Sequence, residues 1–419
     1  MSNTPTRILS PKFKLPKGAW LVVALLFFIG ALNYLDRIMI TTMRSSIIEA
    51  LPMSDAQFGL LTSAFLWTYG ILSPIAGFLA DKFNRSRVVI VSLLVWSIVT
   101  WLTAYARTYD QLLVTRILMG VSEACYFPAA LALIADYHRN TTRSLATGIH
   151  MVGIQVGASM GFLGGIIAEN HTWNYVFIFF GFLGIAYSLV IALFLRDLPK
   201  DKNDTNQDKP GEMINFFGGI RDLFRRKSFL LMLGYWSLLG IVGWMIIGWL
   251  PTYYKEHFNL SQGIAGLYAT GYLYPAQILG LLLGGYLADR WTLTNKRARI
   301  LVPAIGCCIA APSILMASGT TILPLAIFAF MLYAFTRAFG DANMMPMLCM
   351  VVDPRYRATG YGVLNFFGTI VGGTALYAGG VLRDSNVNLS KIYQFAALMM
   401  LLCGLLLFMI KPKSKMDEG

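Results

Sequence analysis

The chain has 419 residues, of which 56% are hydrophobic and only 13% are charged, and its mean hydropathy is +0.60. A soluble domain carries about twice this charged fraction. Here the apolar residues form runs of about 20, the length that spans a bilayer. The composition excludes a soluble globular protein and predicts a polytopic membrane protein. The net charge of +13 predicts no nucleic-acid partner, because the basic residues follow a membrane topology.

Apolar runs separated by polar breaks predict an all-α membrane protein with twelve transmembrane helices. The predicted ranges are 19–42, 56–80, 86–107, 110–136, 142–168, 173–195, 229–252, 262–288, 299–318, 321–351, 357–381 and 391–411. With the N-terminus inside, cytoplasmic segments hold 26 of the 34 Lys and Arg residues, external loops hold five, and helices hold three. This asymmetry places both termini in the cytoplasm. The excess of basic residues therefore reflects topology, with some attraction to anionic lipid.

One polar, charged segment at 196–228, RDLPKDKNDTNQDKPGEMINFFGGIRDLFRRKS, interrupts the pattern. It predicts a cytoplasmic linker that carries a short amphipathic helix near 214–226. The linker divides the chain into an N-terminal six-helix half at 1–195 and a C-terminal six-helix half at 229–411. Residues 412–419 form a predicted cytoplasmic tail.

The two halves resemble each other. GFLADKFNRSRVVI follows the second predicted helix and GYLADRWTLTNKRARI follows the eighth, so Gly77 corresponds to Gly285 and Asp81 to Asp289. The fourth and tenth predicted helices match more loosely, with Glu123 corresponding to Asp341. Both similarities indicate a six-plus-six duplication. Parallel repeats of this kind enclose a substrate site near the bilayer midplane and alternate its access by rocking.

The loop GFLADKFNRSR resembles the signature G-x-x-x-D-R-x-G-R-R of the major facilitator superfamily, and the resemblance extends over essentially the whole chain. Lys82 and Asn84 depart from the signature. Because asparagine tolerates left-handed backbone angles, the turn is expected to be kept. We interpret the loop and its duplicate as a conformational clasp; a solvated basic loop is the alternative. The predicted gating motif comprises Gly77, Asp81, Arg85, Arg87, Gly285, Asp289 and Arg290.

Three further segments resemble the anion:cation symporter branch of that superfamily, whose members carry sugar acids, sialic acid and other organic anions. These are NYLDR at 33–37, RILMGVSEACYFP at 116–128 and WLPTYY at 249–254. Spinster-type lipid carriers share Asp-Arg and Gly-x-x-Glu-Ala, but their serine- and threonine-rich continuation is replaced here by FPAALALIADYH. The resemblance implies proton-coupled uptake of an organic anion such as a hexuronate, aldonate or sialic acid. The alternative is spinster-like transport of a lysolipid or another amphiphile, and a neutral sugar carrier is less favoured.

Charged side chains lie deep inside only a few predicted helices, and intramembrane charge usually has a function. These helices are the first, fourth and tenth, which line the central cavity of the fold that the chain resembles. Arg116 and Glu123 are seven residues apart, so they share one helix face. The six residues are Asp36, Arg37, Arg116, Glu123, Arg337 and Asp341.

The resemblance implies proton-coupling roles for Asp36 and Glu123 and substrate-binding roles for Arg37 and Arg116. A carboxyl group that alternates between an arginine partner and an apolar wall can bind and release a proton near neutral pH. A guanidinium group stays charged and offers two parallel donors to a carboxylate. The alternative is that these residues form ion pairs that only fix the packing of the helices, although buried pairs stabilise weakly.

Other polar residues are candidates for the substrate cavity. Tyr34 lies one turn before Arg37 and can stack on a sugar ring. The resemblance suggests a substrate contact at Gln155, whose amide can reach sugar hydroxyls. Arg337, Asp341 and Asn365 are further cavity candidates, although the first two are four residues apart and can satisfy each other.

An intramembrane enzyme would need a nucleophile with its base, or metal ligands, and none of the four histidines has such spacing. His150 is interpreted as a polar residue near the start of its helix. Five cysteines lie in apolar segments without framework spacing, so neither a metal nor a cofactor is expected, and the driving ion is expected to be H⁺. We expect a monomer in a bacterial inner membrane that binds a small anionic substrate.

Overall fold

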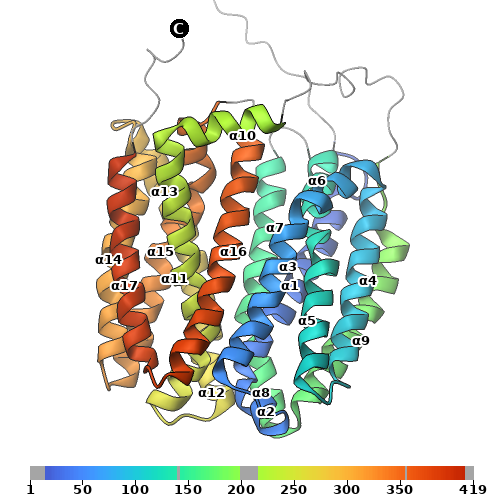
Figure 1. The fold of residues 1–419 in the computed structure, drawn as a ribbon. Helices are drawn as coiled ribbons and strands as arrows, with labels where there is room; N and C mark the ends of the chain where they lie inside the picture. Colours follow the sequence, from blue (N-terminus) through green and yellow to red (C-terminus); the bar gives the residue numbers. More distant parts are fainter. Residues whose placement is uncertain (1–14, 139–141, 199–215, 354–355, 411–419) are drawn as a thin grey trace, which may run out of the picture.

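The computed structural model of the chain describes residues 15–138, 142–198, 216–353 and 356–410. Every regular element within these ranges is a helix (Figure 1). Nine helical rods in the described part of the chain are long and apolar enough to cross a membrane. Three further rods of similar length contain α3, α13 and α16, and together they make the twelve that the sequence predicts.

The N-terminal half contains the first six rods, two of which are broken, and one short additional helix that the sequence did not predict, α2. Its helices are α1 (Ala19–Thr42), α2 (Arg44–Ala50), α3 (Asp55–Lys82), α4 (Arg85–Thr103), α5 (Tyr109–Ala124), α6 (Tyr126–Tyr137), α7 (Arg143–Ser159), α8 (Phe162–Asn170) and α9 (Trp173–Phe194).

The C-terminal half contains the other six rods. After α10 (Phe216–Arg225), its helices are α11 (Lys227–His257), α12 (Gln262–Gly266), the π-helical turn η1 (Leu267–Tyr272), α13 (Leu273–Thr292), α14 (Ala298–Gly319), α15 (Leu323–Val351), α16 (Arg357–Asp384) and α17 (Leu389–Met409). The predicted spans coincide with these rods to within a few residues, and α11 extends furthest beyond its predicted end. The helix α10 lies where an amphipathic helix was predicted; residues 199–215 of the predicted linker lie outside the described ranges, and the predicted domain limits remain predictions.

Prolines account for two irregularities in the helices, the break between α5 and α6 and the π-helical turn η1. Pro128 lacks the N–H that would bind the carbonyl of Ala124, and the helix is interrupted there at Cys125, between α5 and α6. Pro275 likewise leaves the carbonyl of Gly271 without its partner, and the chain widens into η1 just before it. Pro346 lies inside α15 without breaking it.

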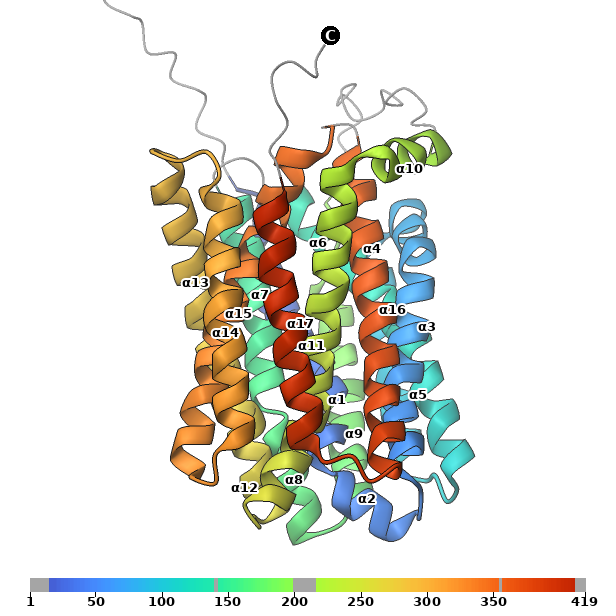
Figure 2. The same cartoon turned by 60° about the vertical axis from the view of Figure 1, so that its left-hand side comes forward.

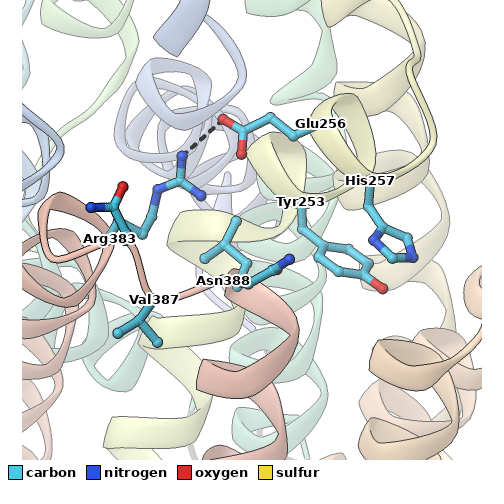
Figure 3. Close-up of a pocket in the computed structure, with 8 residues that line it drawn as sticks. Tyr253, Glu256, His257, Arg383, Val387 and Asn388 are labelled. Carbon is cyan, nitrogen blue, oxygen red and sulfur yellow. Dashed lines mark hydrogen bonds and ion pairs between the residues drawn. The ribbon is translucent and has the colours of Figure 1, made fainter.

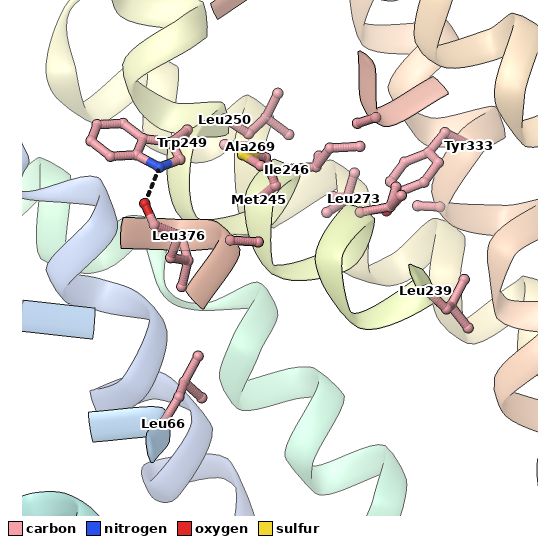
Figure 4. Close-up of a cluster of buried hydrophobic side chains, with 14 of the residues drawn as sticks. Leu66, Leu239, Met245, Ile246, Trp249, Leu250, Ala269, Leu273, Tyr333 and Leu376 are labelled. Carbon is pink, nitrogen blue, oxygen red and sulfur yellow. Dashed lines mark hydrogen bonds between the residues drawn. The ribbon is translucent and has the colours of Figure 1, made fainter. Parts of the chain in front are cut away.

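The two halves pack against each other along α3 and α16, with further contacts between α7 and α13. Leu66 of α3 belongs to the same buried cluster as Trp249 of α11 and Leu376 of α16 (Figure 4). The indole N–H of Trp249 donates to the carbonyl of Leu376 at 3.3 Å. Gly380 of α16 lies so close to the backbone of Asp55 that a Cβ there would overlap it.

The ends of the bundle differ in what they contain. Helix α10 and the C-terminal end of α17 lie at one end, which we call the proximal end (Figures 1 and 2). Helices α2, α8 and α12 lie at the opposite end, which we call the distal end. Hydrogen bonds cross between the halves along the distal part of their interface. They include those from Gln262 to Ser46 and from the Gly263 amide to Glu169.

Candidate functional site

The buried charges of the N-terminal half lie together on α1 and α5. Asp36 and Arg37 are each 4% exposed, and Arg116 and Glu123 are 0% exposed. Asp36 is within electrostatic range of both Glu123 and Arg116. Removing charges from water is costly unless they find partners, so the pairing among these four residues determines what the site can do.

Arg37 and Glu123 form an ion pair that joins α1 to α5. Arg37 Nη2 donates to Glu123 Oε2 at 3.0 Å. Three aromatic rings surround the guanidinium carbon, with centroids at 4.5 Å for Tyr34, 4.8 Å for Phe65 and 4.7 Å for Tyr69. Aromatic faces stabilise a cation without neutralising it, so Arg37 remains a charged group even when Glu123 releases it.

Arg116 has no carboxylate within ion-pair distance among the described residues. Its Nη1 contacts the sulfur of Met119 at 3.2 Å, and its guanidinium carbon lies 5.0 Å from the centroid of Phe65. Its Nε and Nη2 are buried and make no hydrogen bond in the described structure. A fully buried guanidinium with free donors is unfavourable on its own, and an anion beside it would supply the missing acceptors.

Asp36 does not pair with either arginine among the described residues, although its side chain lies in the same region. Its Oδ2 accepts a hydrogen bond from Thr100 of α4 at 3.1 Å. Glu123 Oε1 and Asn33 Nδ2 are buried and unbonded nearby on α5 and α1. The site therefore contains several polar atoms whose hydrogen-bonding capacity is unused.

The charged pair of the C-terminal half lies within one helix. Arg337 Nη1 donates to Asp341 Oδ2 at 2.7 Å, and Gln277 of α13 donates to the same oxygen at 3.3 Å. One helical turn before Gln277, Tyr274 is buried in a small apolar cluster with Ile38 of α1, and Tyr34 packs against the same cluster. Tyr274 is within electrostatic range of both Arg37 and Arg337, so it lies between the charged groups of the two halves.

Two predicted substrate contacts have no partner in the described structure. Gln155 on α7 and Asn365 on α16 are both half-buried, and neither side chain makes a hydrogen bond to another described residue. Phe65, Thr100 and Gln277 contact the charged groups but were not singled out from the sequence. Thr100 and Gln277 are polar residues in apolar runs, which weakly indicates a role in the site. Nothing in the sequence distinguishes Phe65 from other apolar residues of its helix.

The described contacts of the predicted gating loop of the N-terminal half lie within that half. Arg85 forms an ion pair with Asp136 of α6 and also donates to the carbonyl of Ala132 at 3.4 Å. Asn84 has φ −61° and ψ 117°, so the left-handed turn expected there is not formed. Instead, the Asn84 side chain caps α4 by accepting from the amide of Arg87, whose side chain is exposed. The surroundings of Gly77 and the side chain of Asp81 lie outside what the structure describes.

The duplicated loop of the C-terminal half is more exposed. Asp289 is 72% exposed and accepts from Arg299 at 3.1 Å, within the same half. Arg290 is exposed and Gly285 is half-buried, with open space where a Cβ would lie. Across the described part of the chain, no group of three or more His, Cys, Asp or Glu residues is arranged to hold a metal.

Comparisons with known proteins agree with this architecture. The sequence matches the family model of the Major Facilitator Superfamily in two overlapping segments, residues 26–376 and 238–418. Protein spinster homolog 1 of Xenopus tropicalis is 28% identical over 357 residues, which cover 81% of this chain and 68% of that protein. A Cupriavidus necator protein named probable sulfoacetate transporter SauU is 28% identical over 363 residues, 82% of each chain.

A solved structure has the same fold. The crystal structure of a bacterial homolog of the human lysosomal transporter spinster, in an inward-facing and unoccupied conformation, superposes with a TM-score of 0.77. The superposition covers 95% of this chain and 96% of that one at 23% sequence identity. These matches confirm the predicted all-α fold of twelve membrane-spanning helices in two halves and the predicted spinster-like features.

Proposed function

The chain belongs to the major facilitator superfamily of transporters, and we propose that it carries an organic anion into the cell together with protons. The observation that carries this proposal is the buried Arg116 guanidinium, which has two unbonded nitrogens beside the Arg37–Glu123 pair. A solute carboxylate or sulfonate supplies the acceptors that this group lacks. A sugar acid fits best, because Tyr34 and Tyr69 flank the Arg37 guanidinium and the Gln277 amide bonds to Asp341, and such groups can bind hydroxyls.

The proton enters the cycle through Glu123. Protonation removes the charge that holds Arg37 to α5, so Arg37 is freed while its aromatic neighbours keep it in place. Arg37 and Arg116 then bind the anion, and Asp36 takes up a second proton beside them. Loss of the protons on the inner side restores the Arg37–Glu123 pair and expels the solute.

The remaining predicted contacts complete the cavity in this proposal. Tyr34 stacks on the solute, and Gln155 and Asn365 donate hydrogen bonds from the two halves. Arg337 and Asp341 form the C-terminal side of the cavity in this proposal.

The proposed orientation in the membrane rests on the distribution of basic residues. The proposed conformation rests on the contacts at the distal end. We place the proximal end in the cytoplasm of a bacterial inner-membrane protein that acts as a monomer. The hydrogen bonds between Gln262 and Ser46 and between Gly263 and Glu169 join the halves at the distal end, which supports a closed distal side in the conformation described here.

Transport of an amphiphile is the second candidate, and the relatives named spinster support it. Uptake into proteoliposomes separates the two functions. Purified protein should accumulate a labelled hydrophilic organic acid when the outside is acidic, and a protonophore should abolish the accumulation. Movement of a labelled lysolipid, with no uptake of any acid in the panel, would reject the anion proposal.

A further inference from the structure

Four charged side chains form a closed ring at the distal end, with one cation and one anion from each half. In the N-terminal half, Arg44 of α2 pairs with Asp55 of α3. In the C-terminal half, Arg383 Nη2 of α16 lies 2.9 Å from Glu256 Oε1 of α11. Two contacts cross between the halves, Arg383 Nε to Asp55 Oδ2 at 2.8 Å and Arg44 Nη1 to Glu256 Oε1 at 3.5 Å. Cations and anions therefore alternate around the ring.

Neighbouring groups hold the ring in position. The guanidinium carbons of Arg44 and Arg383 lie 5.7 Å and 5.4 Å from the ring centroid of Trp249. Asp384, next to Arg383, accepts from the backbone amides of Asp55 and Ala56 at 2.9 Å and 3.0 Å. A carboxylate of one half thereby caps the N-terminus of α3 in the other half, where the helix dipole favours negative charge.

Water reaches the ring from one side. A pocket of about 360 Å³ adjoins it, lined by Tyr253, Glu256, His257, Arg383 and residues 386–389 (Figure 3). The Glu256 side chain is 46% exposed, whereas those of Arg44, Asp55 and Arg383 are 12% to 15% exposed. The Arg44–Glu256 pair is therefore in contact with water and weak. Arg383 and Asp55 are largely buried, but each keeps another partner in its own half when their contact breaks.

We propose that this ring is the distal gate of the transport cycle, a latch that opens when the halves rock apart. When they separate, the two ion pairs of the ring that join the halves break, and so do the hydrogen bonds from the Asp55 and Ala56 amides to Asp384. Within the ring, Arg44 keeps Asp55 and Arg383 keeps Glu256, so each half retains a neutral pair. The latch goes beyond the proposed function, because its opening does not depend on which solute is carried.

A charge exchange within the C-terminal half tests the gate without changing net charge. The double substitution Glu256→Arg and Arg383→Glu keeps an ion pair inside that half. It places like charges opposite Asp55 and Arg44, so both contacts between the halves become repulsive. The latch predicts that the ratio of open to closed distal ends rises roughly tenfold.

The measurement is the distance between spin labels in the purified full chain after its five cysteines have been replaced. Labels at Glu49 and Ser385 report the distal end, and labels at Phe83 and Leu293 report the proximal end; all four positions are exposed. In the exchanged variant the distal distances should lengthen and the proximal ones shorten. Unchanged distributions at both ends would overturn the proposal.

Two further variants keep the test decisive. Adding Arg44→Glu and Asp55→Arg to the exchanged variant restores the alternation of charge and should return the ratio to within about threefold of the original. The matched control is the double substitution Asp222→Arg and Arg226→Asp, which exchanges the charges of one ion pair at the end of α10 without changing net charge and should leave both distances unchanged. If the fully inverted ring stays as open as the exchanged one, charge pairing is not what closes the distal end.

Discussion

The two halves carry related charged residues that are connected differently. In the N-terminal half, Glu123 pairs with Arg37 on another helix, and the two side chains are 0% and 4% exposed. In the C-terminal half, Asp341 corresponds to Glu123 in the duplication, but it pairs with Arg337 one turn away on the same helix. Those side chains are 22% and 15% exposed.

Because of this difference, protonation of the carboxylate has different structural effects in the two halves. Neutralising Glu123 breaks a contact between α1 and α5, and breaking a buried pair has large effects because a charge is left without its partner. Neutralising Asp341 releases a side chain but separates no helices, apart from the weaker contact with Gln277 of α13. We therefore propose that proton coupling takes place in the N-terminal half.

The largest expected effect belongs to Arg116. Replacing Arg116 with alanine removes the guanidinium that has unbonded donors, and we expect substrate binding to weaken by about 2–5 kcal/mol, roughly 30-fold or more. Equilibrium binding of the transported acid to purified protein measures the loss. Arg116→Lys keeps the charge without the two-pronged donor and should recover only part of the affinity. Full affinity in the alanine variant would remove Arg116 from the binding site.

The next effect concerns Glu123. Glutamine has the shape of the protonated side chain, so Glu123→Gln should hold Arg37 permanently in its released form. We expect gradient-driven accumulation to fall to the equilibrium level while exchange of internal for external substrate continues. Uptake by the unmodified chain should rise as the external pH falls, and uptake by the variant should not. Accumulation that still follows the proton gradient would place coupling elsewhere.

The C-terminal pair should be much less sensitive. Because Arg337 and Asp341 are four residues apart on one helix, replacing both leaves no unpaired charge and separates no pair of helices. The double substitution Arg337→Gln and Asp341→Asn should change the accumulation ratio less than about twofold. If this double variant is uncoupled as completely as Glu123→Gln, the proposed difference between the two halves is wrong.

Much of the fold could be predicted, because membrane helices are long apolar runs that basic loops separate. The prediction located the buried charges but not their pairing. Asp36 and Arg37 are adjacent in sequence, yet consecutive residues of a helix point about 100° apart. Arg37 therefore meets Glu123 on α5, whereas Asp36 meets Thr100 on α4.

Contacts between segments that are distant in the sequence could not be predicted either, because they too depend on how the helices pack. The distal ring joins Arg44, Asp55, Glu256 and Arg383, each of which reads in the sequence as an ordinary loop or helix-end charge. Only the packing of α3 along α16 brings them together. The role expected for Asn84 was wrong for a local reason: its side chain bonds to the first turn of α4, which requires an extended backbone rather than a left-handed one.

The smallest effect is expected for His150, a buried residue that contacts α1. Replacing it tests whether contact with α1 is enough to affect proton coupling. His150 of α7 is fully buried, and its Nδ1 lies 3.1 Å from the carbonyl of Leu26 on α1, while its Nε2 has no partner in the described structure. Because it contacts none of the four charged residues, its expected role is packing. His150→Gln should lower stability by about 0.5–1.5 kcal/mol, the contribution of one hydrogen bond, and leave the pH dependence of uptake unchanged. Thermal unfolding in detergent and uptake at several external pH values measure the two quantities, and a shifted pH profile at unchanged stability would bring His150 into the proton path.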